Sequence, residues 1–195
     1  MDLNPNGDLS GVPAEKRLNV FALVIYIPDP LGRFLDDLRR ELVPGCNPHA
    51  HVSVLPPRPL AVDWQVAGQQ VRTCADAWAP FEIELGPIRM FPVTNVIYIE
   101  LSRGAEEMHR MHALMNTGAL ESPEPFEYHP HITLAQELAP ADVEATNRLA
   151  QRRWAEYTGS RGFRAERAAF VQNTIGNCWL DLAEFSLSAE PVRVK

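Results

Sequence analysis

The amino-acid sequence predicts an α+β fold built from two similar lobes that face each other across a cleft. The order strand, helix, histidine-containing strand, helix, strand occurs twice along the 195 residues. The spacing is also similar, since 30 residues separate His51 from Phe81 and 32 separate His131 from Phe163. A repeated order of elements indicates two lobes related by a pseudo-two-fold axis. Such an axis would place the two histidine strands opposite each other.

The first half of the repeat is expected over about residues 18–93, after a flexible N-terminal arm over residues 1–16. β-branched and aromatic residues indicate the first strand, and Asp29 followed by Pro30 is typical of the start of a helix. Consecutive prolines end the histidine strand, and one apolar face indicates the second helix. The expected elements are a strand over 18–27, a helix over 30–42, a strand over 51–56, a helix over 63–78, and strands over 81–86 and 88–93.

The second half is expected over about residues 94–188 and completes a single bilobal domain over residues 17–195. Its first helix carries a stripe of small and methionine side chains at helical spacing, which Met108 and Met111 represent. The expected elements are a strand over 95–102, a helix over 103–116, a strand over 129–135, a helix over 140–157, and strands over 163–173 and 177–187.

Composition limits the classes of function. The formal net charge of −7 argues against a protein that coats nucleic acid with a broad basic surface. The apolar run over residues 18–27 is too short for a membrane span, so no membrane association is expected. Three scattered cysteines, Cys46, Cys74 and Cys178, form neither a metal pair nor a disulfide framework, which favours the reducing cytoplasm. No obligatory protein partner is evident.

The two histidine strands each have a polar face and an aliphatic face. Because successive side chains of a strand point to opposite sides, His51 and Ser53 share one face, as do His131 and Thr133. Histidine exchanges protons near neutral pH, so one imidazole can act as base while the other acts as acid. The two hydroxyls can hold a phosphate group between the imidazoles by hydrogen bonds. The pattern therefore predicts acid–base chemistry on a phosphate ester, with no metal required.

The tetrapeptides HVSV, residues 51–54, and HITL, residues 131–134, resemble the paired motifs of the two-histidine (2H) phosphoesterases. This family includes bacterial 2′-5′ RNA ligase-like proteins and cyclic phosphodiesterases. The resemblance implies an antiparallel sheet in each lobe, helices on the outer side and an active-site cleft between the lobes. It also implies chemistry without metal or cofactor on 2′,3′-cyclic phosphates or 2′-5′ phosphodiesters, including reversible ligation. The substrates would be RNA ends or small cyclic or 2′-5′-linked nucleotides.

Carried over by position, His51 and His131 would be the catalytic pair, and Ser53 and Thr133 would bind phosphate. Many relatives carry a basic residue just after the second motif, where this chain has Gln136. Further candidate substrate contacts are Arg58, which could supply the missing charge, Tyr128, which could stack on a base, and Gln136, His49 and His129 beside the motifs.

Other interpretations of the same residues stay open at this point. Four imidazoles on two strands could bind a transition metal, although neither motif contains a carboxylate. The chain could also be a catalytically silent member of the fold that binds RNA or nucleotides. His109 and His112 lie on a predicted helix and are expected to be surface or packing residues.

Overall fold

The computed structural model describes residues 12–47 and 49–189 of the chain. The expected arm over residues 1–16 falls mostly outside this range. Its last residues, Ala14–Lys16, form a short 3-10 helix, η1, directly before the first strand.

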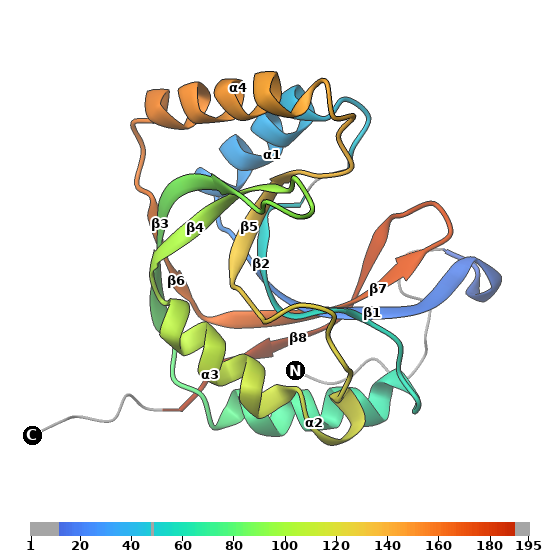
Figure 1. The fold of residues 1–195 in the computed structure, drawn as a ribbon. Coiled ribbons are helices and arrows are strands. Elements are labelled where there is room, and N and C mark those ends of the chain that lie inside the picture. The colour runs from blue at the N-terminus through green and yellow to red at the C-terminus, as the bar shows by residue number, and fades with distance from the viewer. Residues whose placement is uncertain (1–11, 48, 190–195) are drawn as a thin grey trace, which may run out of the picture.

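Within the described residues, eight strands form two four-stranded sheets, each antiparallel throughout, as the resemblance implies. Sheet A has the order β2-β1-β7-β8, with β1 Arg17–Tyr26, β2 His51–Arg58, β7 Arg167–Thr174 and β8 Trp179–Ser186. Sheet B has the order β5-β4-β3-β6, with β3 Phe81–Met90, β4 Ile97–Arg103, β5 His131–Ala135 and β6 Gly162–Ala165. The two motif strands, β2 and β5, are therefore edge strands, and they contact each other (Figure 1).

The helices cover the outer sides of the sheets in pairs. They are α1 Leu31–Leu42, α2 Trp64–Asp76, α3 Ala105–Met115 and α4 Val143–Glu156, with a short 3-10 helix, η2, at Gly118–Leu120. Figure 1 shows α1 and α4 together at the top, where they pack on β5 and β3, and α2 and α3 at the bottom, where they pack on β8 and β2. Helix α1, which follows β1 of sheet A, thus packs on the histidine strand β5 of sheet B. Helix α3, which follows β4 of sheet B, packs on the histidine strand β2 of sheet A.

The two sequence halves, about 18–93 and 94–188, do not coincide with the two sheets. Strand β3 of the first half lies in sheet B, whereas β7 and β8 of the second half lie in sheet A. The repeat therefore describes the order of elements along the chain, and the last strands of each half complete the sheet of the other lobe. This exchange ties the lobes together through the backbone.

Two of the predicted strand boundaries are wrong because of the way each segment pairs in the sheets. The expected break at Gly86 and Pro87 is absorbed as an irregularity in the pairing of β3 with β4, so residues 81–90 form one strand. The single strand expected over 163–173 is divided at Glu166, where the chain passes from sheet B to sheet A. The carbonyl of Glu166 accepts a hydrogen bond from the Leu187 amide at 2.8 Å, which holds this crossing in place.

The aliphatic faces of the motif strands anchor them in one shared core. Val52, Val54 and Ile132 are fully buried, and Leu134 is almost so. Burial of an aliphatic side chain of this size contributes about 1.5–3 kcal/mol. The alternation expected from the sequence is confirmed, and it fixes the opposite, polar face of each strand toward the space between the lobes.

Candidate functional site

His51 begins β2, and its ring is held by the backbone two residues earlier. The Nδ1 atom lies 2.6 Å from the carbonyl oxygen of His49. Because a carbonyl oxygen only accepts hydrogen bonds, Nδ1 must carry a proton and donate it. In the neutral ring, Nε2 is then the nitrogen with a free lone pair.

His131 begins β5 and repeats this arrangement. Its Nδ1 atom lies 2.6 Å from the carbonyl oxygen of His129, so it also donates from Nδ1. The peptide carbonyl at the second position before each motif histidine therefore selects the same tautomer in both lobes. The two imidazoles are equivalent in orientation, and each has Nε2 for proton exchange.

The hydroxyl groups lie on the same strand faces as the imidazoles. Ser53 and Thr133 are half-buried, and each is flanked by buried aliphatic residues. In the sheet register, Ser53 pairs with Val24 of β1 and Thr133 pairs with Tyr98 of β4. Strands β2 and β5 contact each other, so the two motifs lie on neighbouring strands.

Both motif histidines are biased toward the neutral form. The pKa of His51 is lowered to about 4, mainly by burial; the hydrogen bond to the His49 carbonyl opposes this lowering, and repulsion from Arg39, His49 and His131 adds to it. Burial also lowers the pKa of His131, with a smaller contribution from His129. The influence of His131 on His51 means that the two rings are close enough to interact electrostatically. His51 is the more strongly perturbed of the two.

Aromatic side chains flank His51. Tyr26, its partner in the register of β1 and β2, meets it edge-on with ring centroids 6.4 Å apart. The Tyr26 ring stacks on His49 at 3.6 Å, and its hydroxyl donates to Asp181 at 2.6 Å. Burial and the Asp181 carboxylate raise the pKa of Tyr26, so it remains a neutral donor.

A second aromatic pair flanks His131. Phe91 and Tyr98 stack on each other at 4.1 Å, and both present edge-to-face contacts to His131 at 5.1 and 5.2 Å. Both rings also contact His129, whose Nε2 is buried with no hydrogen-bond partner among the described residues. Each motif histidine thus has its own aromatic neighbours, on opposite sides of the site.

Tyr128 does not present a free face for a base to stack on. Its hydroxyl donates to the carbonyl oxygen of Ser53 at 2.7 Å, and its ring stacks on His112 at 3.8 Å. The Nδ1 atom of His112 lies 2.8 Å from the next carbonyl, that of Val54. Two side chains from outside sheet A therefore hold consecutive carbonyls of the first motif, and His112 is a packing residue, as expected.

Arg58 is a buried residue of β2, whereas a solvated loop arginine was the alternative to substrate contact. It is 3% exposed at the far end of β2 from His51. Its guanidinium donates to the carbonyls of Pro56 and Leu120 and to Asn116, and it forms an ion pair with Glu124. These partners make it a structural link between β2 and the segment after α3. Gln136 is exposed beyond the end of β5 and brings no charge to the site.

The structure also adds residues that the sequence gave no reason to select. Asp36 of α1 accepts a hydrogen bond from the Ala50 amide at 2.7 Å, directly before His51. Arg39, one helical turn later, lies close enough to affect the pKa of His51. The spacing of these two residues predicts a common helix face. Which strand that face meets depends on the tertiary packing.

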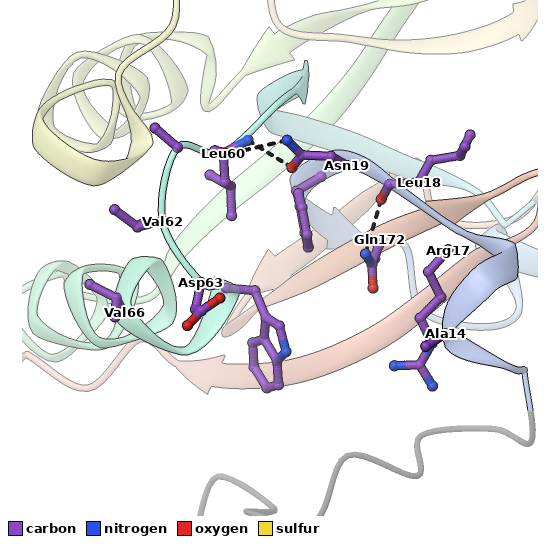
Figure 2. A pocket seen from close by; sticks show the side chains of 12 residues that line it. Ala14, Arg17, Leu18, Asn19, Leu60, Val62, Asp63, Val66 and Gln172 are labelled. Carbon is purple, nitrogen blue, oxygen red and sulfur yellow. Dashed lines mark hydrogen bonds between the residues drawn. The ribbon is translucent and has the colours of Figure 1, made fainter.

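A hollow in the surface lies away from the two motifs. It measures about 840 Å³ and is lined by the start of β1, the loop after β2 and the start of α2 (Figure 2). Phe21 of β1 lines this hollow, whereas His51 pairs with Tyr26, five residues further along the same strand. Five residues of a strand span about 17 Å, so the hollow is separated from the first motif by this distance along β1. Leu60 and Asn19 hydrogen-bond to each other at its edge. Its lining includes no histidine.

The structure also bears on metal binding and on membrane spanning within the described residues. Within residues 12–47 and 49–189, no three histidine, cysteine or acidic side chains gather closely enough to hold a metal ion. In the same range, no helix has the length and hydropathy needed to cross a membrane.

Comparison with known proteins places this geometry in context. The sequence profile of the 2′-5′ RNA ligase superfamily matches residues 27–176. A Bacillus cytotoxicus protein, provisionally named a phosphoesterase, is 32% identical over 75 residues, which are 38% of this chain. That match spans 43% of the relative, so less than half of its length is compared.

Solved structures show the same fold at low sequence identity. E. coli LigT in its apo form superposes with a TM-score of 0.63 at 12% identity, over 89% of this chain and 98% of LigT. TT0787 of Thermus thermophilus gives a TM-score of 0.60 at 18% identity, over 88% of this chain and all of the other. The bilobal arrangement of two antiparallel sheets is therefore a shared fold.

Proposed function

Because the chain belongs to the 2′-5′ RNA ligase superfamily, we propose that it is a metal-independent phosphodiesterase acting on 2′,3′-cyclic phosphate or 2′-5′ phosphodiester bonds. The observation that carries the proposal is the matched pair of imidazoles, each donating from Nδ1 to a carbonyl and each accompanied by a hydroxyl. Such a pair can accept one proton and deliver another around a single phosphorus atom.

The two histidines divide the proton transfers according to their environments. His51 has its pKa lowered to about 4, so its Nε2 is free to accept the proton of an attacking water. The water oxygen bonds to phosphorus as the ribose oxygen leaves, and protonated His131 gives that oxygen its proton from Nε2. Ser53 and Thr133 donate hydrogen bonds to the non-bridging oxygens. The cycle closes when a proton returns from His51 to His131 through solvent, and the reverse sequence forms the diester.

The proposed substrates are RNA ends or small nucleotides. E. coli LigT, which shares the fold, has been crystallised with phosphate and with 3′-AMP. The net charge of −7 disfavours long-range attraction of a long RNA, and thus favours a short substrate held within the cleft.

The test is hydrolysis of 2′,3′-cyclic nucleotides by the wild type, His51→Ala and His131→Ala, each with EDTA present. We expect turnover by the wild type and a loss of at least 100-fold in kcat for each variant, because each removes one proton carrier. Full activity in both variants would place the site elsewhere. Loss of wild-type activity in EDTA, restored by a metal, would support the metal-binding alternative. Nucleotide binding without turnover would support a silent binding member.

A further inference from the structure

Arg39 of α1 stands apart from the neighbouring charged side chains of the same helix. Arg33 pairs with Asp29 at 2.6 Å, and Arg40 pairs with Asp37 at 2.8 Å. The guanidinium of Arg39 makes no hydrogen bond or ion pair with any residue that the structure describes, and its Nε is buried. A buried guanidinium N–H without a hydrogen-bond acceptor is unfavourable unless a ligand supplies one.

The position of Arg39 connects it to the first motif. Asp36 lies three residues earlier, on the same face of α1, and its carboxylate accepts the Ala50 amide at 2.7 Å. This bond fixes the Arg39 face of the helix against the residue that precedes His51. The thiol of Cys46 donates to the Arg39 carbonyl at 3.5 Å, which joins the following loop to the same turn of the helix.

The pKa shifts of Arg39 and His51 agree with a position of Arg39 near the first motif. Burial lowers the pKa of Arg39, which the nearby Asp36 and Cys46 only partly oppose. The same positive charge contributes to the lowered pKa of His51. Asp36 is not a full counter-ion, since its carboxylate bonds to the Ala50 amide and its own pKa is raised by burial.

We infer that Arg39 is an anion-binding residue of this site, which holds a phosphate oxygen of the substrate beside His51. The inference rests on the proposed function for the identity of the substrate. Arg58 is committed to Glu124, and Gln136 is neutral, so neither supplies a cation after the motifs. Arg39 supplies one from the helix that packs over the opposite lobe. A guanidinium fits this task because it presents several donors in a fixed plane and stays charged.

Inorganic phosphate is the probe for the direct test. In wild-type protein, titration with phosphate should shift the Nε–Hε resonance of Arg39, identified by its absence from the spectrum of Arg39→Lys. Arg39→Gln should weaken phosphate binding at least about tenfold, as expected for loss of a charge-assisted hydrogen bond. Arg39→Lys should retain part of the affinity.

Arg40→Gln is the matched control, because Arg40 is the next residue of the helix, exposed and already paired with Asp37. It should bind phosphate as the wild type does. Thermal denaturation of both variants checks that each is folded. A second readout is the pKa of His51 by NMR, which should rise in Arg39→Gln and stay unchanged in Arg40→Gln, because only the first removes a nearby positive charge.

The outcomes separate this inference from the proposed function. If Arg39→Gln binds phosphate as tightly as the wild type, or if phosphate leaves the wild-type Arg39 resonance unmoved, the inference is wrong whether or not the enzyme turns over. If the wild type hydrolyses no 2′ phosphodiester but its phosphate affinity depends on Arg39, the proposed function fails and the anion site stands.

Discussion

The hydroxyl of Tyr128 donates a hydrogen bond to the carbonyl oxygen of Ser53 at 2.7 Å, and so joins the segment before one motif to the strand of the other. Tyr128, which precedes the second histidine strand, thereby fixes the backbone of the first strand at Ser53, the residue that we propose to bind phosphate. The two halves of the site are thus linked directly, in addition to the packing of β2 against β5.

Replacing Tyr128 with phenylalanine should weaken this link while keeping the ring stacked on His112. We expect a loss of about 1–3 kcal/mol in the free energy of unfolding, because the Ser53 carbonyl loses its side-chain donor, and a several-fold decrease in kcat. Urea denaturation and steady-state kinetics measure the two effects. Tyr157→Phe is the control, since that hydroxyl makes only a 3.4 Å contact with the Ser160 carbonyl. Equal behaviour of the two variants would show that the link has no role.

The pH dependence of kcat/KM should be bell-shaped with an acidic optimum. On the acidic side, activity should fall near pH 4 as His51 becomes protonated. On the alkaline side, it should fall as His131 loses its proton, with a midpoint below the ordinary histidine value of 6.5 because burial lowers its pKa. Initial rates on a 2′,3′-cyclic nucleotide between pH 3.5 and 9 would reveal both limbs. A flat profile through this range would contradict the assignment of both histidines.

Stability should decline as the pH falls from about 6.5 to about 4. In this window the unfolded chain protonates His51, whereas the folded protein, with the pKa of His51 at about 4, does not, so protons favour unfolding. A pKa lowered from 6.5 to about 4 corresponds to roughly 3 kcal/mol, and the partial solvent exposure of His51 reduces this contribution. Chemical denaturation of His51→Asn should show a flatter slope across the window. His109→Asn, at an exposed position, should retain the wild-type slope.

Arg58→Met distinguishes a structural role from contact with substrate. Removing the guanidinium breaks a buried ion pair and leaves Glu124 with only His112, whose Nε2 lies 3.3 Å away, and loss of a buried pair typically costs about 3–5 kcal/mol in unfolding free energy. We expect a large decrease in the denaturation midpoint, with the KM of the folded fraction unchanged. A raised KM at wild-type stability would instead place Arg58 in contact with substrate.

Ile132→Ala tests the aliphatic anchor of the second motif strand. Its side chain is fully buried, so truncation should cost about 2–5 kcal/mol through lost burial and a residual cavity. Val93→Ala changes a side chain that is 80% exposed and should alter stability by less than about 0.5 kcal/mol. Urea denaturation of both variants gives the comparison. Similar midpoints would mean that the core does not fix β5.

The polar face of each motif strand could be predicted from the sequence because it depends only on local geometry. Side chains alternate along a strand, so Val52 and Ile132 had to oppose the imidazoles once both segments were strands. The repeated order of elements likewise predicted two lobes. Strand boundaries were less secure, since the irregularity at Gly86 and the crossing at Glu166 depend on which sheet each segment joins.

The sequence by itself determined the two His-x-Ser/Thr strands, the fold class and the family resemblance. Only the tertiary structure decided that β3 joins sheet B, that Arg58 is buried against Glu124, and that Arg39 approaches His51. The reason is physical: alternation and helical periodicity are properties of residues that are neighbours along the chain. The three facts that the tertiary structure decided depend instead on contacts between separate elements of the fold. A side chain's partners are therefore fixed only when the packing of the elements is known.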